Sequence, residues 1–248
     1  MKKTLLAVLL GSFALASFAQ PITIEKQGAF SAGGTVIEAK KTFDPYHPEP
    51  DAMTLHGDHA NIIYQIPAHA KPVSLMFLHG AGQSMRTWQT TPDGREGFQS
   101  VFLRKGYPVY LIDQPRRGDA GRATVDGTIK ASPDEQFWFG QFRMGLWPKF
   151  YDNSAFASQK DLNSFWRQMT PNTAPYNDKV IADAVTDALQ KTEGTVLVTH
   201  SQGCGPGWLI GTEAGKNLKG IIAFEPGSGF IFPEGKVPAP ISNNSFFG

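Results

Sequence analysis

The stretch T-V-L-V-T-H-S-Q-G-C-G-P-G-W spans residues 195–208. Its apolar run is typical of a buried strand, and the small residues after the serine suit the start of a helix. A sharp strand-to-helix turn crowds the positions two before and two after a serine at its tip. Gly203 meets this requirement, whereas Thr199 departs from glycine but is still fairly small. The pattern predicts that Ser201 is a nucleophile; the alternative is a serine that only caps a helix.

Three further apolar runs resemble the strand before Ser201. Each is followed by a polar loop, and helical stretches are expected over about 95–105, 178–191 and 203–216. The four predicted strands are residues 73–78, 107–112, 196–198 and 221–224. Apolar runs that end in such loops are typical of parallel strands buried on both faces. Alternating strands and helices predict an α/β fold with a mostly parallel central sheet, whose ligand site lies at the carboxyl ends of the strands.

The remaining segments differ from this alternation. Residues 20–70 predict β-structure, with strands over 22–26, 35–39 and 61–66 and a turn at Gly33-Gly34. Residues 114–177 are rich in aromatic side chains and contain no clear strand. A long insertion at the carboxyl edge of a sheet commonly covers the ligand site, so this segment is predicted to be a lid. The alternative is a packing excursion that does not contact a ligand.

The N-terminus predicts a secretory signal peptide. Met1-Lys2-Lys3 is basic, an apolar run follows, and small residues precede a cleavage site after Ala19. Removing residues 1–19 removes two of the 23 basic residues, which leaves 21 against 22 acidic ones. This balance gives no electrostatic basis for binding nucleic acid or a membrane surface. We expect a secreted or periplasmic protein without a membrane anchor, in which residues 20–248 form a single domain.

The loop H-G-A-G-Q follows the first buried strand, at residues 79–83. A glycine-rich loop at this position directs backbone N–H groups into the site, where they stabilise a developing oxyanion. The predicted oxyanion hole combines the amide of Ala81 or Gly82 with that of Gln202, which follows the nucleophile. His79 is expected to hold this loop. The alternative is a plain turn.

Two acidic residues follow buried strands, Glu225 and Asp113. Glu225 ends the strand after the strand of Ser201, so it should lie beside the nucleophile, where a carboxylate orients a catalytic histidine. Asp113 precedes Q-P-R-R-G, which favours a role in structuring that loop or in an ion pair. Arg116 or Arg117 is a candidate for an acidic substrate group, although a salt-bridged arginine is favoured.

The histidines leave the general base unassigned. His200 adjoins Ser201, and neighbouring side chains at a sharp turn diverge. His79 is expected in the layer beneath the oxyanion hole. The run from His56 to His59 contains two histidines and an aspartate, but no further ligands complete a metal site. No metal site is therefore predicted. The only cysteine, Cys204, excludes an internal disulfide and is expected to be a small buried residue.

Taken together, these pieces resemble the α/β-hydrolase superfamily, and more closely a group of secreted bacterial esterases, the esterase 713-like family. The matching stretches are Q-G-A-F-S-A-G-G-T-V (27–36), L-H-G-D-H-A (55–60), F-L-H-G-A-G-Q-S (77–84), T-P-D-G-R-E-G-F (91–98), L-I-D-Q-P-R-R-G-D-A-G-R (111–122), T-H-S-Q-G (199–203) and F-E-P-G (224–227). The resemblance implies Ser201 as nucleophile, Glu225 as acid and an oxyanion hole near Ala81 and Gln202.

The sequence departs from this family in its cysteines and in its C-terminal part. A member of this family carries disulfides, and in the superfamily the catalytic histidine follows further strands and helices. No histidine follows His200 here, so we expect a chain that lacks the C-terminal strands and helices together with the base. The leading hypothesis is a serine hydrolase of small-molecule carboxylic esters that uses no cofactor. The alternatives are an exported, non-catalytic protein that binds small molecules, and a lactonase or amidase.

Overall fold

The protein is represented by a computed structural model that describes residues 21–156 and 158–229. The predicted signal peptide, residues 1–19, lies outside the described residues. None of the helices in the described ranges is long and apolar enough to cross a membrane.

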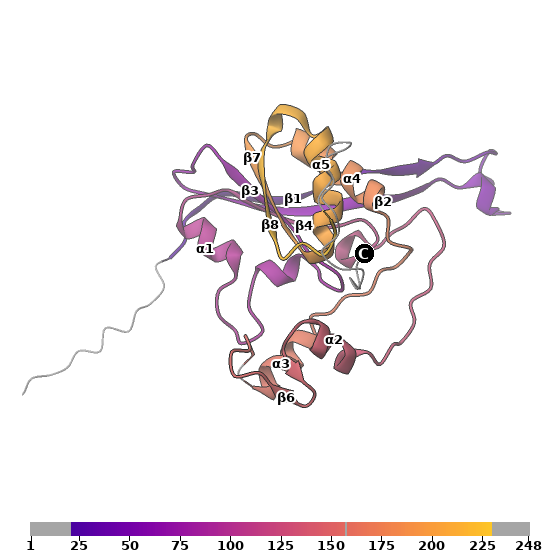
Figure 1. Cartoon of the computed structure of the whole chain (residues 1–248). Coiled ribbons are helices and arrows are strands. Elements are labelled where there is room, and N and C mark those ends of the chain that lie inside the picture. Colours follow the sequence, from indigo (N-terminus) through magenta and orange to yellow (C-terminus); the bar gives the residue numbers. More distant parts are fainter. Residues whose placement is uncertain (1–20, 157, 230–248) are drawn as a thin grey trace, which may run out of the picture.

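A mixed six-stranded sheet forms the centre of the molecule (Figure 1). In spatial order its strands are β1 (Ile24–Ile37), β2 (Leu55–Pro67), β4 (Val109–Asp113), β3 (Ser74–Leu78), β7 (Thr195–His200) and β8 (Leu218–Phe224). β1, β2 and β4 pair antiparallel, whereas β4, β3, β7 and β8 run parallel to one another. The carboxyl ends of all four predicted parallel strands therefore meet at one edge, which confirms the predicted fold class.

Helices cover both faces of the sheet, as Figure 1 shows. α4 (Asp178–Gln190) and α5 (Cys204–Glu213) pack on one face, and α1 (Phe98–Arg104) packs on the other. In β3, Met76 contacts the α4 side while Phe77 contacts the α1 side, because successive side chains of a strand point to opposite faces. This double coverage explains why all five residues of β3 are buried and why the four from Leu75 to Leu78 are apolar.

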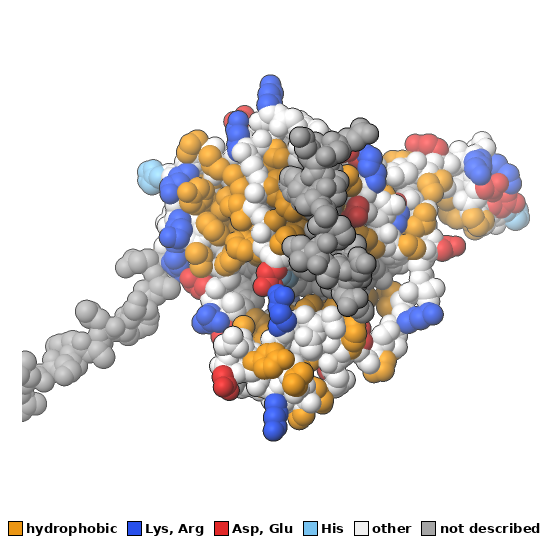
Figure 2. Space-filling model, viewed as in Figure 1, with side chains coloured by type: hydrophobic (Ala, Val, Ile, Leu, Met, Phe, Trp, Pro, Cys, Tyr) orange, Lys and Arg blue, Asp and Glu red, His pale blue; other side chains and the backbone are white. Residues whose placement is uncertain are grey.

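The segment between β4 and α4 forms a separate lobe beside the carboxyl edge of the sheet (Figures 1 and 2). It contains α2 (Glu135–Gln141), β5 (Gly145–Leu146), β6 (Lys149–Phe150) and α3 (Gln159–Trp166). Phe139, Met144 and Leu162 form its own small core, which other aromatic side chains surround. Short 3-10 turns complete the chain: Pro50–Ala52, Met85–Trp88, Gly118–Ala120, Ser201–Gly203 and Gly215–Asn217. We call the lobe between β4 and α4 the lid.

The predicted turn at Gly33-Gly34 is wrong. β1 runs without interruption from Ile24 to Ile37 and keeps one register on β2 on both sides of the two glycines. Both glycines have a positive φ, of 62° and 97°. A Cβ at Gly33 would lie 2.5 Å from the Cα of Ala184 in α4. Gly33 therefore allows close packing of α4 on the strand, and Gly34 allows close approach of β2, where a Cβ would lie 2.8 Å from the carbonyl oxygen of Gly57. Neither glycine reverses the chain.

This packing gives a matched test, because Gly215 has nearly the same φ, 61°, but nothing within 4 Å of its Cβ position. Gly215→Ala should cost about 1 kcal/mol of unfolding free energy, from the left-handed backbone alone. Gly33→Ala adds overpacking against α4 and should cost about 3 kcal/mol in total. Urea unfolding measures both values. Equal losses in the two variants would contradict the close packing of Gly33 on α4.

Candidate active site

Ser201 lies at the turn between β7 and α5 and has a φ of 50°. A left-handed backbone is uncommon and strained for a non-glycine residue, and such strain clusters at functional sites. Gly203 is required here, because a Cβ would lie 2.4 Å from the carbonyl oxygen of His79. Thr199 is accommodated because its methyl group faces Gly207, where a Cβ would lie 2.9 Å away. The departure from glycine at position 199 is thus compensated within α5.

The loop after β3 packs directly on this turn. A Cβ at Gly80 would lie 2.9 Å from the Cβ of Ser201, so only glycine fits there. Ala81 lines the cavity that contains Ser201. Gly82 has a φ of 64° and faces the lid instead: its carbonyl oxygen accepts a hydrogen bond from the Thr170 amide at 2.7 Å. Of the two candidate residues in this loop, Ala81 is therefore the one that lines the cavity.

The loop after β8 lies on the other side of the nucleophile. The amide of Gly227 donates to the carbonyl oxygen of Ser201 at 3.0 Å, and Glu225 lines the same cavity. Glu225 has a φ of 43°, a second non-glycine residue in the left-handed region. Its carboxylate forms an ion pair with Arg143 of the lid at 3.1 Å, and both side chains are largely exposed. The two predicted catalytic side chains therefore share one cavity.

His200 is hydrogen-bonded to the loop after β3. Its Nδ1 lies 3.0 Å from the side-chain oxygen of Gln83, an acceptor, which assigns the ring proton to Nδ1. Burial lowers the pKa of His200, and the carboxylate of Glu225 partly opposes this shift. His200 thus braces the loop that contains Gln83, because the same side-chain oxygen also accepts the amide of Gly80 at 3.0 Å.

His79 is fully buried beneath the site. Its Nδ1 lies 3.1 Å from the carbonyl oxygen of Gly80, and its Nε2 accepts the amide of Gln114 at 3.5 Å. Burial and the nearby guanidinium of Arg117 lower the pKa of His79 to about 3, so the ring is neutral. The 3.8 Å approach of Nε2 to Asp113 is therefore not an ion pair. The structure agrees with the expectation that His79 holds the loop.

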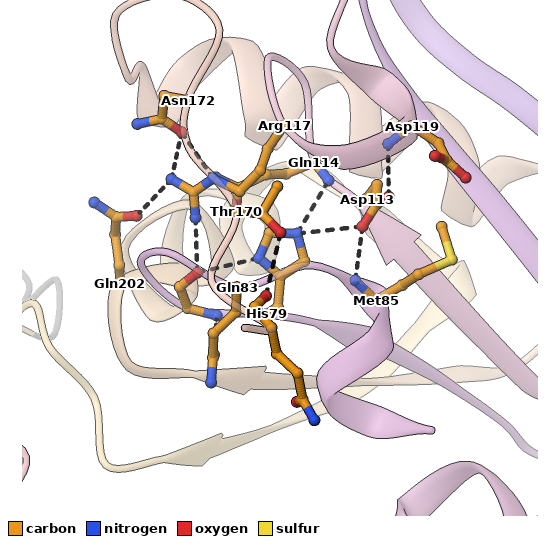
Figure 3. Close-up of polar contacts among 12 residues, drawn as sticks. His79, Gln83, Met85, Asp113, Gln114, Arg117, Asp119, Thr170, Asn172 and Gln202 are labelled. Atoms are coloured by element: carbon orange, nitrogen blue, oxygen red, sulfur yellow. Dashed lines mark hydrogen bonds and ion pairs between the residues drawn. The ribbon is translucent and has the colours of Figure 1, made fainter. Parts of the chain in front are cut away.

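Asp113 structures the loop after β4. One carboxylate oxygen accepts the amide of Met85 at 2.6 Å, and the other accepts the amide of Asp119 at 2.8 Å. Burial raises the pKa of this carboxyl. A Cβ at Gly118 would overlap it, at 2.2 Å. These contacts occupy both oxygens with loop amides (Figure 3).

The two adjacent arginines have different partners. Arg116 pairs with buried Asp58 through two hydrogen bonds, at 2.8 and 3.0 Å. This pair accounts for the aspartate between His56 and His59, and no group of three or more possible metal ligands gathers anywhere in residues 21–156 and 158–229. Arg117 instead bonds Gly80 in the loop after β3, Asn172 between the lid and α4, and Gln202, as Figure 3 shows. Sequence reasoning did not distinguish these roles.

The cavity at the sheet edge has a volume of about 810 Å³. The lid contributes an aromatic wall, and the sheet edge contributes polar groups. The aromatic side chains that line it are Trp138, Phe142, Phe156 and Phe165. At the polar side, the hydroxyl of Tyr176 donates to Asp178 at 2.5 Å, and burial together with this bond raises the pKa of Tyr176. The arrangement suits a largely apolar ligand with a reactive group held at Ser201.

Comparisons with known proteins agree with this geometry. The "Probable secreted lipase phiG" of Fungal sp. (strain ATCC 74256) is 32% identical over 165 residues, which make up 63% of this chain and 45% of that lipase. The chain thus spans less than half of this curated relative. A solved structure described as a novel bacterial esterase superimposes with a TM-score of 0.72 and 29% identity, over 85% of this chain and 70% of the esterase.

The family pattern extends over most of the chain. The pattern of the alpha/beta hydrolase family matches residues 75–246, which include β3, the turn at Ser201 and the loop of Glu225. The sheet order, the strained serine after β7 and the lid inserted after β4 agree with that match. The resemblance found in the sequence is confirmed, and this chain belongs to the alpha/beta hydrolase family.

Proposed function

We propose that the chain forms the core of a carboxylic ester hydrolase in which Ser201 is the nucleophile. One observation carries this proposal: Ser201 adopts a strained left-handed turn facing a cavity that Ala81, Gln202 and Glu225 also line. Two similar proteins, a bacterial esterase and a probable secreted lipase, support an ester as the substrate class. The aromatic wall of the lid supports an apolar acyl or alcohol group.

In the proposed reaction, the Oγ of Ser201 forms a bond to the ester carbonyl carbon and gives up its proton to a base. The carbonyl oxygen becomes an oxyanion, which the amides of Ala81 and Gln202 stabilise. The alcohol then leaves with a proton, and water attacks the acyl-enzyme to release the acid and restore Ser201. The mechanism calls for no cofactor or metal.

Glu225 is the proposed acid, and its present partner supports this role. The carboxylate already binds a cation, the guanidinium of Arg143, at the rim of the cavity. A carboxylate placed in this way is suited to stabilise the imidazolium that forms during attack. Arg143 and an incoming imidazole would then compete for the same oxygens.

The base is proposed to be a histidine outside these 248 residues. The chain has six histidines, at positions 47, 56, 59, 69, 79 and 200. Of these, His200 lines the cavity, but it adjoins Ser201 at a sharp turn, where neighbouring side chains diverge, and Gln83 holds its ring. The bacterial esterase and the lipase both contain sequence that this chain does not cover, which supports a base supplied from elsewhere. Export to the periplasm or beyond is proposed from the signal peptide and from the secreted relative.

Replacing the nucleophile tests the proposed function. Ser201→Ala should reduce the hydrolysis of a p-nitrophenyl ester to the buffer background, because no other group forms the acyl-enzyme. The matched control is Ser164→Ala, which removes an exposed hydroxyl from α3 and should retain wild-type hydrolysis. Initial rates with purified proteins measure both. Hydrolysis that persists in Ser201→Ala would contradict the proposal, whereas ester binding without Ser201-dependent turnover would favour a binding protein.

Added imidazole tests the missing base. If the position beside Ser201 and Glu225 lacks a histidine ring, imidazole should increase Ser201-dependent hydrolysis and the increase should saturate, because the free ring occupies the vacant position. The Ser201→Ala variant measures the hydrolysis that imidazole causes in solution. The Ser201-dependent rate is the rate of the wild type minus that of Ser201→Ala. If this rate does not change as imidazole is added, the idea that the base lies outside these residues is contradicted.

A further inference from the structure

Arg117 is a buried cation behind the proposed oxyanion hole. It is among the largest fully buried side chains of the described residues, and only 2% of it is exposed. Arginines are rarely buried without a paired charge. Among residues 21–156 and 158–229, no carboxylate lies within ion-pair distance of its guanidinium, and Asp113 acts on it only at longer range. A charge kept in this position needs another explanation than an ion pair.

The guanidinium joins three segments that are distant in sequence (Figure 3). It donates to the carbonyl oxygen of Gly80 at 2.8 Å, to the side-chain oxygen of Asn172 at 2.8 Å and to the side-chain oxygen of Gln202 at 3.4 Å. Gly80 belongs to the loop after β3, Asn172 to the connection from the lid to α4, and Gln202 to the turn after β7. Each predicted half of the oxyanion hole thus contacts the same side chain.

The bond to Gly80 has a direct consequence for Ala81. The carbonyl of Gly80 and the amide of Ala81 belong to one planar peptide group, in which the C=O and N–H bonds point in opposite directions. Arg117 holds the carbonyl on the buried side. The N–H of Ala81 therefore points the other way, and Ala81 lines the cavity. A charged donor on the carbonyl also polarises the peptide, which makes its N–H a stronger donor.

The bond from Arg117 to Gln202 concerns the second half of the proposed oxyanion hole. Gln202 follows Ser201, and its own amide is the other proposed oxyanion donor. Its side chain is held by Arg117, and its carbonyl oxygen lies 3.3 Å from the hydroxyl oxygen of Tyr176, whose proton is donated to Asp178. These contacts restrict the backbone on which the amide lies. Arg117 thereby links the two segments that contain the proposed donors.

We propose that Arg117 is a positioning residue of the oxyanion hole, which aligns and polarises the peptide between Gly80 and Ala81 and braces Gln202. This inference rests on the proposed function. Arg117 acts through these groups and does not touch the substrate. The burial of the guanidinium lowers the pKa of Arg117 to about 10, so the charge is kept at neutral pH.

The adjacent Arg116 provides a matched control. It is also buried, but it bonds Asp58 and the carbonyl oxygen of Pro175, away from the oxyanion loop. Arg116→Met and Arg117→Met should both lower the melting temperature. Only Arg117→Met should reduce kcat for a p-nitrophenyl ester, by about tenfold or more, with KM changed by less than about twofold. Arg117→Lys, which keeps a charge but loses the fork of donors, should lie between wild type and Arg117→Met.

An unchanged kcat in Arg117→Met, or an equal fall in kcat in Arg116→Met, would overturn the proposal. A second measurement does not depend on turnover. The ¹⁵N shift of Ala81 reports the hydrogen bond on the Gly80 carbonyl, because both atoms share a peptide group. It should move in Arg117→Met and stay unchanged in Arg116→Met; an unmoved shift in Arg117→Met would overturn the positioning role. Failure of the proposed function would appear separately, as hydrolysis by the wild type that does not depend on Ser201.

Discussion

The left-handed backbone of Ser201 is the constraint on which the rest of the site depends. A side chain in this conformation is strained, so neighbouring segments must hold it in place. Three glycines allow them to approach: Gly80 faces the Cβ of Ser201, Gly203 faces the carbonyl of His79, and Gly227 faces the Oγ of Ser201. The loops after β3, β7 and β8 thus meet at the serine, where the parallel strands bring their carboxyl ends together.

A layer of buried polar groups supports this meeting point from below. Neutral His79 and charged Arg117 both donate to the carbonyl of Gly80, and Asp113 binds the amides of the loops on either side. Buried polar groups are costly unless they are hydrogen-bonded, and here they are bonded mainly to backbone. The layer therefore specifies the shape of three loops at the same time. A site assembled in this way is rigid on the sheet side, while the lid supplies the apolar wall.

The sequence predicted the regular parts well and the long-range contacts poorly. Apolar runs identified the parallel strands, and the residues around Ser201 identified the turn, because both patterns are local. The predicted turn at Gly33-Gly34 is wrong because a positive φ also occurs where a helix or a neighbouring strand approaches the backbone closely, which the sequence alone does not distinguish from chain reversal. Arg116 and Arg117 are adjacent arginines, and the sequence does not distinguish them. Their partners in the fold do, because Arg116 forms an ion pair with Asp58 whereas Arg117 binds the carbonyl oxygen of Gly80.

The central claim is that Ser201 is the nucleophile of an ester hydrolase. The most direct measurement is peptide mass mapping after incubation with an activated ester. If the base is absent, acylation is slow, but deacylation needs the same base, so the acyl-enzyme should accumulate. A single acyl group is expected on the peptide that contains Ser201. An unmodified Ser201, or an acyl group on another residue, would contradict it.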